Sequence, residues 1–102
     1  MRIRLRQVAF VAADLSPVEA DIEEHLGLES CFRDPGVARF GLRNVLYPVG
    51  DQLLEVVSPT EAGTTAGRLL AKRGGDGGYM VILQVDDLEP HRRRFAETRA
   101  RV

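Results

Sequence analysis

The stretch that decides the fold, Gln7–Pro17 (QVAFVAADLSP), occurs again in diverged form as Met80–Pro90 (MVILQVDDLEP). The two stretches are offset by 73 positions and share a valine near the start and the corner Asp-Leu-x-Pro at the end. Each is an apolar run of strand length that leads through this corner into a helix-like segment. A repeat with so long a period predicts two copies of one β–α unit rather than a solenoid of short repeats.

The first copy predicts a strand over residues 3–13 and a helix directly after it. The middle of the strand is apolar at every position, which is typical of a strand covered on both faces. Ser16 is expected to cap the helix, Pro17 suits its first position, and Glu19 would complete a capping box. Apolar residues then recur at every fourth position, and Gly27 is expected to end the helix.

The rest of the chain predicts short strands, turns and two further helices. With the first strand and helix, residues 3–58 read β–α–β–β–β. We therefore expect one α+β domain, with a first module over 1–59, a linker with a short helix over 60–78, and the start of a second module over 79–102. The remaining expected elements are strands over 29–33, 37–42, 45–49 and 53–57, a helix over 66–72, a strand over 79–85 and a helix over 89–99.

The composition excludes several classes of protein. The chain has 102 residues, enough for one domain, and its net charge of −1 gives no reason to expect nucleic acid or an acidic membrane as a partner. Cys31 is the only cysteine, so no internal disulfide can form, which fits a reducing compartment. No apolar run reaches membrane-spanning length, and the N-terminus lacks the features of a signal peptide. We therefore expect a cytoplasmic protein.

Three stretches resemble motifs of the vicinal oxygen chelate superfamily, which includes glyoxalase I, bleomycin-resistance proteins and extradiol dioxygenases. Leu5–Leu15 resembles the first strand of that family, Asp51–Pro59 its fourth strand, and Gly78–Leu88 the first strand of its second module. The three occur in the family's order and together span nearly the whole chain. The resemblance implies a glyoxalase-like fold, in which paired βαβββ modules curl their sheets around a cleft. Here the second module is expected to stop after its first strand and helix.

The resemblance also implies a site for a divalent metal ion. Carried over position by position, the family's ligands fall on Gln7, Glu55 and Met80, and the fourth falls on a strand that this chain lacks. A methionine thioether suits the hard ions of these enzymes poorly. The resemblance therefore implies a degenerate metal site with Gln7 and Glu55 as ligands, and Glu55 as the catalytic residue.

Strand alternation places Glu55 on the same face as Leu53 and Val57. A buried carboxylate without a partner would be costly, so Glu55 is expected to contact a metal ion, water or an amide such as Gln7 or Gln84. The residues expected to face a ligand are Gln7, Leu53, Glu55, Met80, Ile82 and Gln84.

Three functions stay open. The first is the binding of a small organic molecule in a cleft between two sheets. The second is a metal-dependent lyase, isomerase or dioxygenase whose site is completed by absent residues or by a partner chain. The third is a non-catalytic module that sequesters an antibiotic or dimerises. Because the strand over 79–85 would present an open edge, we also expect a homodimer that can exchange elements.

Overall fold

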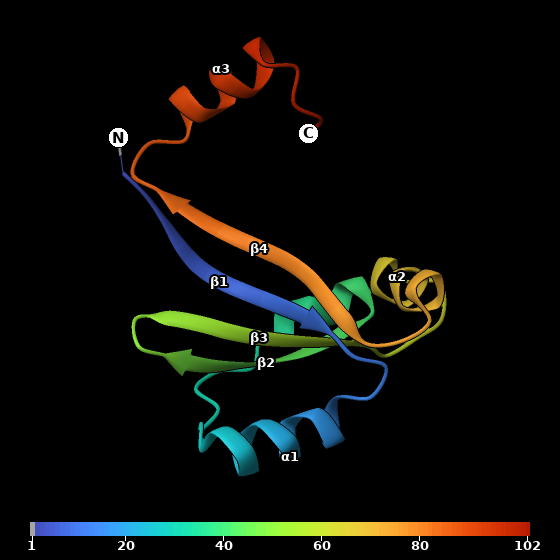
Figure 1. Ribbon diagram of the computed structural model, residues 1–102. Helices are drawn as coiled ribbons and strands as arrows, with labels where there is room; N and C mark the ends of the chain where they lie inside the picture. Colours follow the sequence, from blue (N-terminus) through green and yellow to red (C-terminus); the bar gives the residue numbers. More distant parts are fainter. Residues whose placement is uncertain (1) are drawn as a thin grey trace.

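Residues 2–102, the part of the chain that the computed structural model describes, form one four-stranded sheet with helices around it. The strands lie in the order β2-β3-β1-β4, with β1 parallel to β3 and antiparallel to β4 (Figure 1). The predicted α+β class is confirmed. In chain order the elements are β1 (Ile3–Val11), α1 (Leu15–Leu26), the 3₁₀-helix η1 (Pro35–Phe40), β2 (Leu42–Val49), β3 (Gln52–Pro59), α2 (Thr65–Arg73), β4 (Gly77–Val85) and α3 (Glu89–Glu97).

The two copies of the repeated stretch meet as the antiparallel pair β1 and β4. Val8 lies opposite Val81, which is also its equivalent under the offset of 73 positions. A local two-fold axis therefore passes between these valines. The irregularities of the ladder obey the same symmetry, because Arg6 in β1 and Tyr79 in β4 are both left without a cross-strand partner and are also 73 positions apart. The division of the chain into modules at 59 and 78 stays a prediction.

The helix α1 packs on one face of the sheet and begins two residues earlier than predicted. Asp14 is its cap and accepts a hydrogen bond from the N–H of Ser16 at 3.3 Å, so the predicted cap at Ser16 is wrong. The predicted capping box is also absent, since the Glu19 carboxylate pairs with Arg33 instead. Gly27 ends the helix in the left-handed conformation, as predicted, with φ at 65°.

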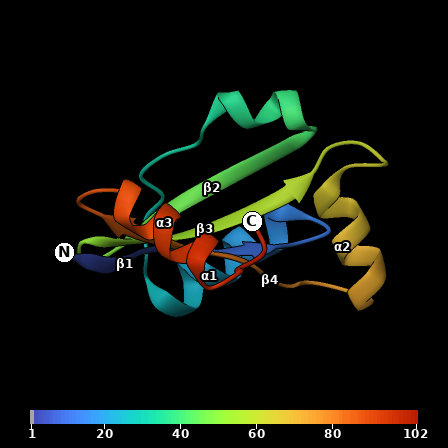
Figure 2. The same ribbon diagram turned by 90° about the horizontal axis from the view of Figure 1, so that it is seen from above.

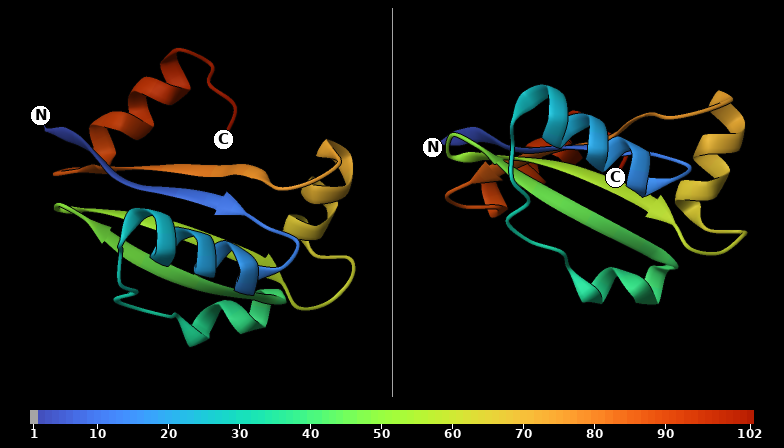
Figure 3. Two further views of the ribbon diagram at one scale, coloured as in Figure 1. Left: turned by 60° about the horizontal axis from the view of Figure 1, so that its bottom comes forward. Right: turned by 90° about the horizontal axis from the view of Figure 1, so that it is seen from below.

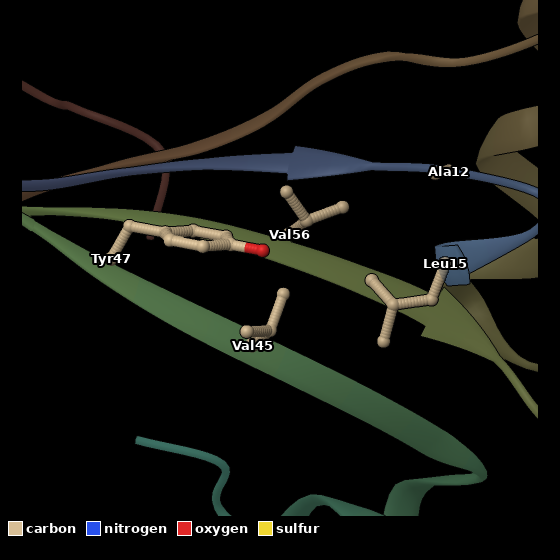
Figure 4. Packing of buried hydrophobic residues seen from close by; sticks show 5 residues of the cluster. All are labelled: Ala12, Leu15, Val45, Tyr47 and Val56. Carbon is tan, nitrogen blue, oxygen red and sulfur yellow. The ribbon is translucent and has the colours of Figure 1, made fainter. Parts of the chain in front are cut away.

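The core under α1 is built around the corner residue Leu15. Figure 4 shows this side chain beside Val45 of β2 and Val56 of β3, with Tyr47 of β2 beyond them, and Ala12 belongs to the same cluster. Tyr47 is wholly buried, and its hydroxyl donates to the Glu23 carboxylate at 3.1 Å. Burial, which is the larger cause, and this hydrogen bond together raise the pKa of Tyr47 to about 12.

The helix α2 packs on the opposite face of the sheet, at one end (Figure 2). Its residues Ala66 and Leu70 pack on Val11 of β1 and Val57 of β3. Because successive residues of a strand point to opposite faces, Val57 faces α2 while its neighbour Val56 faces α1. Figure 3 shows that α1 and α2 cover only part of the sheet, and that α3 extends beyond its β4 edge.

Two predicted strands are absent from the described part of the chain. The strand over 37–42 is wrong, because residues 35–40 form η1. The Asp34 side chain caps this turn by accepting the N–H of Gly36 at 2.9 Å, and Pro35 supplies a helical φ at its first position. The strand over 29–33 is reduced to a single bridge between Phe32 and Leu46. None of the helices within residues 2–102 is long and apolar enough to cross a membrane.

Candidate functional site

Glu55 lies at the centre of a polar row that crosses three strands. It faces away from α1, because its neighbours Leu54 and Val56 pack on the α1 side. Gln7 of β1 donates from Nε2 to Glu55 Oε1 at 2.5 Å, and Asn44 of β2 donates from Nδ2 to Oε2 at 2.7 Å. Each oxygen of the carboxylate therefore accepts one amide N–H. Of the two amides that the sequence suggested as partners of Glu55, Gln7 makes the contact.

The strand register explains why two amides reach one carboxylate. Opposite Glu55 lie Ala9 on β1 and Leu46 on β2. Gln7 and Asn44 each stand two residues from these positions, on the diagonals of the sheet. Diagonal neighbours in a sheet are about 7–8 Å apart, a gap that two polar side chains can bridge.

A cleft of about 550 Å³ opens over Glu55. Glu55, Val57 and Met80 contribute to its floor, which the sheet forms. Its walls are η1 and the loop that leads into α2, and the N–H of Thr60 ties them together by donating to the Gly41 carbonyl at 2.8 Å. The cleft was predicted to lie between two sheets. That prediction is wrong, because the described residues form one sheet and the walls are helical and loop segments.

The predicted ligand-facing residues fall into two groups. Glu55 and Met80 line the cleft, and Gln7 adjoins it through its hydrogen bond to Glu55. Alternation along a strand predicts the face on which a side chain lies but not its place along that face. The other three residues lie toward the ends of β3 and β4 that are remote from α2, so they do not line the cleft. These residues are Leu53, Ile82 and Gln84.

Sequence reasoning missed Asn44, which lies between the strands predicted over 37–42 and 45–49. The signal was present, because Asn44 is a polar residue between Leu42 and Leu46 on an otherwise apolar face of its strand. The structure leaves it 4% exposed. A buried amide on the face that also carries Glu55 needs a polar partner, and this requirement identifies the pair.

The walls of the cleft carry two arginines that the sequence did not single out. Arg39 comes from η1 and Arg68 from α2, and both line the cleft. Arg39 places its guanidinium 5.4 Å from the centre of the Phe40 ring. Arg68 donates to the Gly63 carbonyl at 2.6 Å and to the Thr65 hydroxyl at 3.2 Å. The carboxylates that line the cleft are Glu55 and Glu61.

A divalent metal ion of the kind that the resemblance implies does not fit these side chains. Asn44 accepts the N–H of Asp34 on its Oδ1 at 2.8 Å, so its NH₂ group, which cannot bind a cation, must face Glu55. Met80 offers only a thioether, which is a soft ligand. Across residues 2–102, no three side chains of His, Cys, Asp or Glu lie close enough to share a metal ion. The polar row is arranged to satisfy a carboxylate rather than to coordinate a cation.

No protein-family model matches the chain, and no curated protein matches it. Solved structures do match. A methylmalonyl-CoA epimerase from Mycobacterium tuberculosis covers 95% of this chain with a TM-score of 0.81 and 24% identity, and the chain covers 65% of that structure. A methylmalonyl-CoA epimerase in complex with methylmalonyl-CoA and NH₄⁺ covers 100% of this chain with a TM-score of 0.83 and 18% identity. A hypothetical protein from Bacillus halodurans covers 96% of this chain with a TM-score of 0.86 and 15% identity.

These likenesses establish the fold. The chain has the fold of these epimerase structures, which is the glyoxalase-like fold that the three sequence motifs predicted. It covers 74% of the epimerase structure that contains methylmalonyl-CoA and 70% of the Bacillus halodurans structure. At 24% identity or less, the likenesses identify an architecture and not an activity.

Proposed function

We propose that this chain is a glyoxalase-like module that binds a small organic molecule in the cleft over Glu55, with a degenerate metal site. The observation that carries the proposal is the polar row. Glu55 lines the cleft, yet each of its oxygens is held by an amide from a neighbouring strand. Such a carboxylate is oriented before any ligand arrives, and it keeps lone pairs with which to accept a ligand hydroxyl or N–H.

Two further observations support small-molecule binding. The volume of about 550 Å³ lies within the range of about 300–1,000 Å³ that ligand sites usually occupy. Solved structures with the same fold are described as complexes with CoA thioesters, methylmalonyl-CoA in one and 2-nitronate-propionyl-CoA in another. Short hydroxy acids, keto acids and acyl thioesters are therefore the first compounds to test.

The test is a titration of the ¹⁵N-labelled protein with these compounds, followed by amide chemical shifts. We expect saturable shifts at Glu55, Met80 and the η1 wall, with none at Gly27, which lies away from the cleft. Shifts confined to the α1 side of the sheet would contradict the proposal. Elemental analysis of the purified protein tests the metal separately. Stoichiometric metal that is lost in Glu55→Ala would favour the alternative, a metal-dependent lyase, isomerase or dioxygenase.

We also propose that the chain forms a homodimer through the free edge of β4. Within the described residues this edge has no strand partner, and Val81 and Leu83 on β4 are 65% and 55% exposed. Exposed apolar edge strands pair readily with other strands. Light scattering after size exclusion tests this proposal. We expect a dimer that Val81→Lys converts to a monomer, whereas a wild-type monomer at about 1 mM would refute it.

A further inference from the structure

We propose that the cleft recognises a small organic acid, a molecule with a carboxylate at one end and a hydrogen-bond donor at the other. The inference rests on the proposed function and adds the class of ligand. It is carried by the distribution of charge in the cleft. Two arginines line the walls, and neither has a carboxylate within ion-pair distance in residues 2–102.

The first arginine, Arg39, has no side-chain hydrogen bond within the described chain. Its guanidinium lies over the face of Phe40, at 5.4 Å from the ring centre. A cation over an aromatic face keeps its charge and all five of its N–H donors. Arg39 is therefore held beside the cleft with its capacity for a bidentate bond to a carboxylate unused.

The second arginine, Arg68, is positioned by uncharged groups. It donates to the Gly63 carbonyl and to the Thr65 hydroxyl, which use two of its N–H groups and leave its positive charge unbalanced. The Gly63 bond holds Arg68 to the loop that forms the second wall. Arg39 and Arg68 thus belong to the two walls that the hydrogen bond from Thr60 to Gly41 joins.

The floor of the cleft has the opposite character. Glu55 accepts one amide N–H on each oxygen, and a carboxylate offers about four acceptor positions. It therefore still accepts a hydroxyl or N–H from a ligand, while it repels a second carboxylate. A ligand that spans the cleft is oriented by this contrast, with its acid group at the arginines and its donor at Glu55. Glu61, which also lines the cleft, adds a second negative charge and weakens the binding of anions.

The experiment compares 2-hydroxybutyrate with its methyl ester and with butyrate, by amide-shift titration of the full chain at low salt. The ester lacks the charge and butyrate lacks the donor. We expect each change to weaken binding by up to about fivefold, because an exposed charged contact contributes at most about 1 kcal/mol. Arg39→Gln and Arg68→Gln should each weaken the acid by a similar factor and leave the ester unaffected. Glu61→Gln should tighten binding of the acid.

Arg92→Gln is the matched control, because Arg92 is an exposed arginine on α3 that does not line the cleft. Circular dichroism confirms that each variant is folded. If acid and ester bind equally and the arginine variants change nothing, the inference fails while the proposed function stands. If none of the three compounds moves the amides of the cleft, both fail. Shifts outside the cleft that persist in Arg39→Gln also overturn the inference.

Discussion

Replacing Asn44 with alanine tests the polar row most directly. The substitution removes the N–H that Asn44 donates to Glu55 at 2.7 Å and the carbonyl that accepts from Asp34 at 2.8 Å. A hydrogen bond to a charged group contributes about 1.5–3 kcal/mol and a neutral one about 1 kcal/mol. Glu55 is only partly buried, so water recovers part of the loss. We expect Asn44→Ala to lower the free energy of unfolding by about 2–3 kcal/mol.

The measurement is urea unfolding followed by circular dichroism, with a double-mutant cycle on Asn44 and Glu55. The coupling energy between Asn44→Ala and Glu55→Ala should be about 1.5 kcal/mol or more, because either change removes the same bond. Arg43→Ala is the control, since this exposed neighbour makes only a 3.5 Å ion pair and should cost under about 1 kcal/mol. If Asn44→Ala lowered the free energy of unfolding by less than about 0.5 kcal/mol and showed no coupling to Glu55→Ala, the polar row would not be a stabilising interaction.

Three further predictions follow from single residues. Asp14→Ala should lower the free energy of unfolding, measured in urea, by about 1 kcal/mol, because it removes the α1 cap, whereas Ser16→Ala should lower it by a few tenths of a kcal/mol at most. The pKa of Tyr47 is about 12 in the folded state and about 10 unfolded, so the contribution of this side chain to stability is constant below pH 10 and falls by up to about 2–3 kcal/mol as the pH rises to 12; Tyr47→Phe should abolish this part of the pH dependence. Gly41→Ala should destabilise the protein more than Gly27→Ala by thermal unfolding, since both have positive φ but only at Gly41 would an added Cβ lie 2.6 Å from another side chain.

The sequence predicted the fold well where the local and tertiary signals agree. The repeated stretch predicted β1 and β4 and the helices that follow them, and Gly27 correctly marked the end of α1. The strand predicted over 37–42 failed because its apolar residues carry no period that separates a short strand from one turn of helix. Asp34 decided the outcome, since its side chain caps a helical turn through a hydrogen bond that a hydrophobic pattern does not reveal.

The candidate site could be predicted only in part. Strand alternation was enough to place Glu55 on one face with Leu53 and Val57, and the family resemblance pointed to Gln7 as a neighbour of Glu55. The contribution of Asn44 depended on register, since β2 must pair with β3 at the position that brings residue 44 diagonal to residue 55. Register follows from the packing of whole strands and is not encoded by any single residue. The arginines of the walls, Arg39 and Arg68, come from η1 and α2, whose approach depends on the loop between β3 and α2.

The local two-fold symmetry separates what a sequence motif determines from what its surroundings determine. Leu15 and Leu88 are equivalent under the repeat and occupy the same corner, yet Leu15 is 1% exposed and Leu88 is 53% exposed. The motif forms the strand and the helix in both copies. Burial of the corner leucine, worth about 1.5–3 kcal/mol, also requires the side chains that β2 and β3 supply to α1 and that no described element supplies to α3. Local opening of α3 should therefore cost less free energy than opening of α1, although the two helices begin from the same motif.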